Sequence, residues 1–154
     1  MEGRKIFGNI VKVGLIYALV CVLGNFFVTA SPRKRISVEQ AESLVRSEQE
    51  YSGKKINFTP TSHDSLPPEV LGMVRSYHGE YYIIMDSSSI DKKVLLHEIA
   101  HTKISEPNTA RGTFNFSAYR KECKQRSILY YIPYVFSPKE LFCNLYALEK
   151  SFIR

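Results

Sequence analysis

An uninterrupted apolar stretch near the start of the chain contrasts with the alternating pattern that follows it. Residues 13–30 carry no charge and are long enough for an export signal or a membrane anchor. The small side chains from Val28 to Ala30 suit cleavage by signal peptidase after Ala30, and Gly24 with Asn25 predicts a helix break just before them. Basic residues flank the stretch equally on both sides, so the positive-inside rule does not orient it. The sequence therefore predicts a protein that is secreted or otherwise extracytoplasmic, with a cleaved signal peptide or a retained anchor.

The rest of the chain alternates between helical and strand-like spacing of apolar residues. Ser37 opens the first helix after the apolar stretch, Ser88 and Asp91 have the spacing of a capping box for a later one, and His78-Gly79 suits a hairpin turn. The predicted elements are a helix at 37–51, a strand at 54–60, a β-hairpin at 70–86, and helices at 90–103, at 116–131 and from Ser137 towards Arg154.

This order of elements predicts an α+β fold. We expect a short mixed sheet, with the β-hairpin at its edge, to pack against the helix at 90–103, with a further helix at the C-terminus. Residues 37–154 have the length of one domain, preceded by residues 1–30 and a basic linker at 31–36. A hydrophobic content of 44% and a charged content of 23% exclude disordered and collagen-like proteins.

The formal net charge of +6 comes from short basic groups spread along the chain, such as Arg33-Lys34-Arg35. Groups of this kind usually form a solvated surface, and they also attract anionic membranes or polymers. No RRM, zinc knuckle or helix-turn-helix signature accompanies them, so we predict no nucleic-acid partner. No feature of the sequence indicates an oligomeric state.

The helix at 90–103 contains the motif HEIAH at residues 97–101. His97 and His101 lie four residues apart, so both imidazoles can reach one zinc ion from the same helical face. Glu98 occupies the position of the general base in this motif. The general base accepts a proton from the attacking water and passes it to the leaving amine. Uncharged residues at 94–96 fit a helix buried beneath an active site, whereas Lys103 stands where such enzymes usually have an apolar residue.

The third metal ligand must be a glutamate or a cysteine, because no histidine or aspartate follows His101. The candidates are Glu106, Glu122, Glu140, Glu149, Cys123 and Cys143. We favour Glu140, because Asn144 and Ala147 share its helix face and are small enough for close approach to the HEIAH helix. Asn144 could then hydrogen-bond the second nitrogen of a ligand histidine.

Glu140 and the two cysteines also have alternative roles, and Glu140 has a rival as ligand. Glu140 also forms a capping-box spacing with Ser137, so it could serve only as a helix cap. Glu149, on the opposite face of the same helix, is the rival ligand. Cys123 and Cys143 could instead form a disulfide if the domain is exported.

HEIAH, followed at long spacing by Ser-Pro-Lys-Glu-Leu-Phe-Cys-Asn-Leu-Tyr-Ala, resembles the lethal-factor-like gluzincins, which include secreted Pro-Pro endopeptidases. The resemblance implies a small zincin-like domain and covers the chain from about Tyr81 to the C-terminus. The second helix of that family typically reads Glu-x-Phe-Ala-Glu, which places the glutamate ligand on Glu140 and retains Phe142. Cys143 replaces the alanine and Asn144 replaces the following glutamate.

The resemblance also implies a tyrosine that stabilises the oxyanion shortly before the ligand helix. Family spacing puts Pro133 at this place, so we assign the role to Tyr134 by a shift of one residue, with Tyr131 as the second choice.

The predicted function is zinc-dependent hydrolysis of a peptide or protein substrate, with Glu98 as the general base. We expect the substrate to lie extended along an edge strand within Tyr81–Met85. The alternative is a non-catalytic zinc-binding or interaction protein that keeps a zincin fold, a reading motivated by Asn144 and Pro133. A further alternative is a cytoplasmic gluzincin tethered through residues 13–30.

Overall fold

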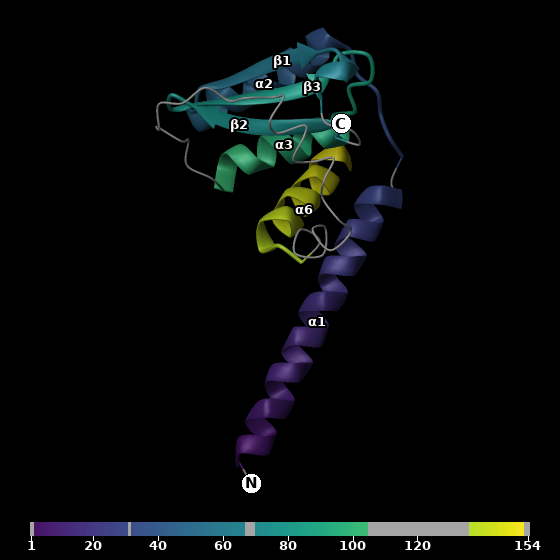
Figure 1. Ribbon diagram of the computed structural model, residues 1–154, viewed down its shortest axis with the longest axis vertical. Helices are drawn as coiled ribbons and strands as arrows, with labels where there is room; N and C mark the ends of the chain where they lie inside the picture. The colour runs from purple at the N-terminus through teal and green to yellow at the C-terminus, as the bar shows by residue number, and fades with distance from the viewer. Residues whose placement is uncertain (1, 31, 67–69, 105–135, 153–154) are drawn as a thin grey trace.

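The computed structural model describes residues 2–30, 32–66, 70–104 and 136–152, and these form an α+β architecture (Figure 1). This part of the chain contains four helices, one 3-10 turn and a three-stranded sheet. Their bounds are α1 (Glu2–Ala30), α2 (Val38–Ser52), β1 (Ile56–Thr61), η1 (His63–Ser65), β2 (Gly72–Tyr77), β3 (Glu80–Asp86), α3 (Lys92–Ile104) and α6 (Pro138–Phe152). The helix predicted at 116–131 lies outside the described residues.

The sheet is mixed, with strand order β1-β3-β2. β1 runs parallel to β3, with Ile56 opposite Tyr81, and β2 runs antiparallel to β3, with Tyr77 opposite Glu80. The predicted hairpin is confirmed, and its turn residues His78 and Gly79 have φ angles of 51° and 80°. Two successive left-handed residues are typical of a tight type I′ turn, whose twist matches that of the flanking strands.

The core lies between the sheet and the two helices α2 and α3. Alternate residues of β3 point to this side, where they meet apolar side chains of both helices, as the strand periodicity requires. The buried members of this cluster are Ala41, Val45, Ile56, Tyr81, Ile83, Met85, Ile90, Leu95 and Ile99. The opposite face of the sheet carries a smaller cluster of Leu66, Met73 and Ile84. α3 therefore lies directly beneath the sheet.

β3 is the central strand of the sheet, so the prediction of an edge strand within Tyr81–Met85 is wrong. The reason is that β1 pairs with β3 in parallel and covers the side left free by β2. Tyr81 and the run from Ile83 to Asp86 are buried, which suits a strand with neighbours on both sides. In the described part of the chain, the edge strand beside α3 is β2.

The start of α3 differs from the prediction. Its first turn is capped by Asp91, whose Oδ1 accepts hydrogen bonds from the Lys93 and Val94 backbone amides at 2.8 and 3.2 Å. Ser88 does not cap this helix, because its amide and hydroxyl both bond to Asp86. The prediction for α2 is confirmed, since the Ser37 hydroxyl accepts from the amide at the third helical position in a complete capping box.

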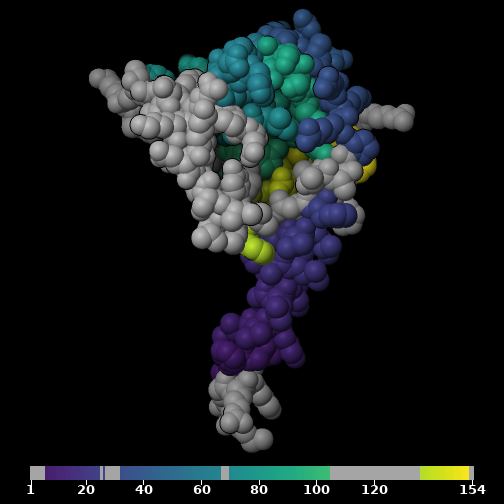
Figure 2. Space-filling view, turned by 45° about the vertical axis from the view of Figure 1, so that its right-hand side comes forward, coloured from purple at the N-terminus to yellow at the C-terminus, as the bar shows by residue number. Residues whose placement is uncertain are grey.

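α1 is a continuous helix and projects from the rest of the molecule (Figures 1 and 2). The predicted break at Gly24 and Asn25 is wrong, because Gly24 instead serves a close contact with α6. The apolar helix contains a candidate membrane span at Ile6–Gly24, which fits a signal peptide or an anchor. The basic segment that follows α1 runs beside the start of α3, where the Ile36 amide donates to the Ile90 carbonyl at 3.1 Å.

Candidate metal centre

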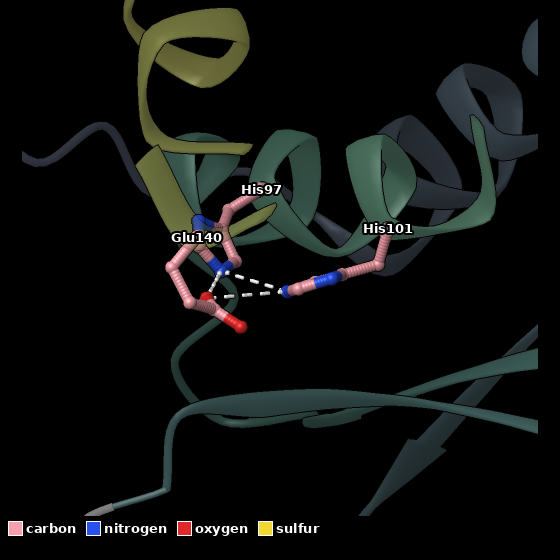
Figure 3. A group of neighbouring side chains, drawn as sticks. All are labelled: His97, His101 and Glu140. Carbon is pink, nitrogen blue, oxygen red and sulfur yellow. Dashed lines mark hydrogen bonds and ion pairs between the residues drawn. The ribbon is translucent and has the colours of Figure 1, made fainter. Parts of the chain in front are cut away.

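Three potential metal ligands from two helices meet beneath the sheet (Figure 3). His97 and His101 project from adjacent turns of α3, and Glu140 reaches them from the first turn of α6. The two Nε2 atoms are 3.2 Å apart, and Glu140 Oε2 lies 3.2 Å from His97 Nε2 and 3.4 Å from His101 Nε2. All three side chains are largely shielded from solvent, with 13 to 18% of their surface exposed.

The spacing of these atoms fits a tetrahedral zinc site. Ligand bonds of about 2.0–2.1 Å in a tetrahedron place neighbouring ligand atoms about 3.3–3.4 Å apart. The three observed separations of 3.2, 3.2 and 3.4 Å form almost this triangle. Two imidazoles and one carboxylate also form a donor set that zinc prefers and that leaves a fourth position for water or substrate. The residues present therefore fit a zinc ion.

The electrostatic surroundings favour a cation at this position. Burial alone would lower the pKa of His101, but its hydrogen bond to the Glu140 carboxylate and the charges of Glu98 and Glu140 outweigh burial and raise the pKa overall. The carboxylates that stabilise an imidazolium here would stabilise a bound divalent cation for the same reason.

Glu98 lies in the sequence position predicted for the general base and is buried beside the two histidines. Burial raises the pKa of its carboxyl, and the nearby His97 and His101 side chains oppose this shift. The backbone of Val74 in β2 also hydrogen-bonds this carboxyl. The candidate base is thus held between the metal ligands and the edge strand, a contact with β2 that sequence reasoning missed.

The close approach of α6 to α3 depends on small residues, as the sequence predicted. Asn144 and Ala147 are buried against α3, and Cys143 beside them is fully buried. Glu149 is exposed and lies outside the ligand cluster, so the structure brings Glu140, rather than Glu149, to the histidines. Among the described residues, no cysteine belongs to the cluster.

Cys143 carries a free thiol, so no disulfide forms at this residue. Burial raises the pKa of the thiol to about 12, and the charges of Glu140 and Glu98 act in the same direction. The group is therefore a neutral packing residue at neutral pH. Several sequence-derived candidates lie outside the described residues, namely Glu106, Glu122, Cys123, Tyr131, Pro133 and Tyr134.

Lys103, which departs from the usual apolar residue, has a structural role that the sequence did not reveal. Its ammonium forms an ion pair with Glu48 of α2 and lies 5.3 Å from the ring centroids of both Tyr51 and Tyr146. Only 21% of the Lys103 side chain and 11% of the Glu48 side chain are exposed. This pair ties the end of the histidine-bearing helix to α2 and α6.

We expect Glu48→Gln to lower the free energy of unfolding by about 1–2 kcal/mol, because it leaves the shielded Lys103 ammonium without its counter-charge. Denaturant unfolding in detergent measures this loss, and Glu42→Gln, an exposed change on the same helix, is the control. The double variant Glu48→Gln/Lys103→Met should recover part of the loss. Equal stability of the Glu48→Gln and Glu42→Gln proteins would contradict the assigned role.

The chain was compared with protein-family models, with curated proteins and with solved structures, and none of the three comparisons finds a match.

Proposed function

We propose that this chain is a zinc-dependent endopeptidase. The observation that carries the proposal is the convergence of His97 Nε2, His101 Nε2 and Glu140 Oε2 at distances suited to tetrahedral zinc, with the buried Glu98 next to them. A helix bearing HExxH beneath a mixed sheet, with a glutamate ligand on a later helix, is the arrangement expected of a zincin-like fold. The resemblance to lethal-factor-like gluzincins agrees with the same ligand set.

The chemistry follows from the position of each side chain. A zinc ion held by His97, His101 and Glu140 would polarise the scissile carbonyl. It would also lower the pKa of a zinc-bound water to about 7. Glu98 accepts a proton from the attacking water and delivers it to the leaving amine. The raised pKa of the buried Glu98 carboxyl suits both steps, because it is closer to neutral pH than the pKa of an exposed glutamate.

An extended peptide substrate would bind along the edge of the sheet formed by β2. β2 has a neighbour on one side only in the described part of the chain, and it contacts α3 through Val74 and Glu98. An extended peptide paired with β2 would pass beside the candidate base and gain main-chain hydrogen bonds from the strand. This replaces β3 as the strand expected to hold the substrate.

The test of the proposed function is a peptidase assay of the purified full-length chain with a broad peptide library, in zinc and after zinc removal. We expect cleavage that disappears with the metal and returns when zinc is restored. Stoichiometric zinc binding without cleavage of any peptide would instead support a non-catalytic zinc-binding protein with this fold.

A further inference from the structure

α1 packs on α6, the helix that carries the glutamate ligand. The Tyr17 hydroxyl donates a hydrogen bond of 2.8 Å to the Phe136 carbonyl, immediately before α6. Cys21, one turn later on the same face, is fully buried. Gly24, a further turn along, approaches so closely that a Cβ atom there would lie 2.8 Å from Leu141 Cδ1. α1 is therefore fixed against α6 by Tyr17 and Gly24, which lie two turns apart.

The remaining surface of the span in α1 is largely apolar, with Lys12 as its one charged residue, and it is not covered by the protein. The span Ile6–Gly24 has a mean hydropathy of 2.2, and only 6% of it is buried within the molecule. Its length of about 28 Å matches the hydrocarbon thickness of a bilayer, about 30 Å. A helix of the soluble core would be covered on most sides, whereas lipid can cover the apolar side chains that α1 exposes.

The contacts with α6 bring the candidate metal centre close to the bilayer. Tyr17 and Gly24 both lie within the candidate span, so the segment that they contact lies close to the bilayer when the span crosses it. Tyr17 lies two helical turns, about 10 Å, deeper in the span than Gly24. Its bond to the Phe136 carbonyl satisfies two polar groups that lipid could not satisfy, and it places the start of α6 below the surface. Glu140 is adjacent to Leu141, so the ligand cluster lies close to the bilayer as well.

The charges around this end of α1 fit the lipid headgroups. Arg33, Lys34 and Arg35 follow the span and are exposed, and Lys139 is exposed beside the ligand Glu140. Basic residues next to a span attract the anionic headgroups of a bilayer. The Lys34 carbonyl accepts a hydrogen bond of 2.9 Å from the Lys92 amide, so this basic segment is held against the start of α3.

We propose that α1 is retained as a membrane anchor and that its packing on α6 holds the candidate metal centre at the membrane surface. Cleavage after Ala30 would remove the residues that contact α6, so α1 is a structural part of the protein. The consequence for substrates rests on the proposed function: the peptides within reach of the site are segments close to the bilayer.

The experiment exploits the absence of tryptophan from the chain. Phe136→Trp places a single fluorophore at the start of α6, and Thr59→Trp places one at an exposed position of β1, on the far side of the molecule from α1 (Figure 1). The full chain is reconstituted in phosphatidylcholine vesicles with brominated acyl chains, which quench fluorophores inside the bilayer. We expect the Phe136→Trp protein to lose roughly half of its fluorescence or more, because it lies within the hydrocarbon thickness of ~30 Å. The Thr59→Trp protein should lose little.

A second pair of variants tests the contact itself. Gly24→Leu in the Phe136→Trp protein should reduce the quenching, because the new side chain collides with Leu141. Gly14→Leu, the same change on the same helix where nothing lies within 4 Å, should leave quenching unchanged. Equal, weak quenching of Phe136→Trp and Thr59→Trp would overturn the proposal, as would a mature protein whose mass lacks residues 1–30. Adding Glu98→Gln should not alter the quenching, so loss of the proposed activity and loss of the proposed location are distinguishable.

Discussion

The Glu98→Gln protein should bind zinc as the parent does and yet lose peptidase activity by about 10²–10⁴-fold. An amide has nearly the same shape as the carboxyl, but it cannot accept the proton of the attacking water. Glu98 lies outside the ligand triangle, so the separations among His97, His101 and Glu140 do not depend on it. Zinc content and the cleavage rate of a library peptide are measured on the same preparation.

His97→Ala is the contrasting variant, because it removes a ligand and should abolish both zinc binding and cleavage. Turnover at the parent rate in the Glu98→Gln protein would reject Glu98 as the base. Loss of zinc from the Glu98→Gln protein would also contradict the assignment, since it would make Glu98 a ligand rather than a base.

Glu140→Gln should weaken zinc binding on the order of tenfold or more, because a neutral amide is a much poorer ligand than a carboxylate. Glutamine can also complete a capping box, so the change preserves a capping role of this residue. Glu149→Gln on the same helix is the matched control, since Glu149 is exposed and outside the cluster. Zinc affinity is measured by competition with a chelator of known affinity.

The stability of the metal-free protein should hardly change in either variant. If zinc affinity and cleavage survive Glu140→Gln but not Glu149→Gln, the ligand assignment is wrong. Survival in both variants would transfer the third ligand to a residue such as Cys123 or Glu122 and would remove the basis for the family resemblance in the last helix.

The local elements were predictable from the sequence because their signals are local. Ser37 marks the start of α2, and His78-Gly79 marks the hairpin, through turn and cap chemistry confined to a few residues. The face of α6 was also predictable, because Glu140, Asn144 and Ala147 repeat at helical spacing and two of them are buried.

Contacts between distant segments were not predictable in the same way. The central place of β3 depends on parallel pairing with β1, and neither strand carries a signal of that pairing. The sequence alone predicts a helix break at Gly24, and only the structure shows that Leu141 approaches this glycine. Lys103 likewise departs from the expected apolar residue, and its ion pair with Glu48 accounts for the difference. In each case the deciding partner lies far away in the sequence.

The central claim is that two histidines and one glutamate bind a zinc ion, and X-ray absorption at the zinc edge of the zinc-loaded full chain tests it most directly. We predict one zinc per chain, with only nitrogen and oxygen neighbours at about 2.0–2.1 Å and a scattering pattern typical of two imidazoles. A sulfur neighbour at about 2.3 Å would instead show a cysteine ligand and contradict the assignment of Glu140. Failure of the chain to retain zinc at all would contradict the metal centre itself.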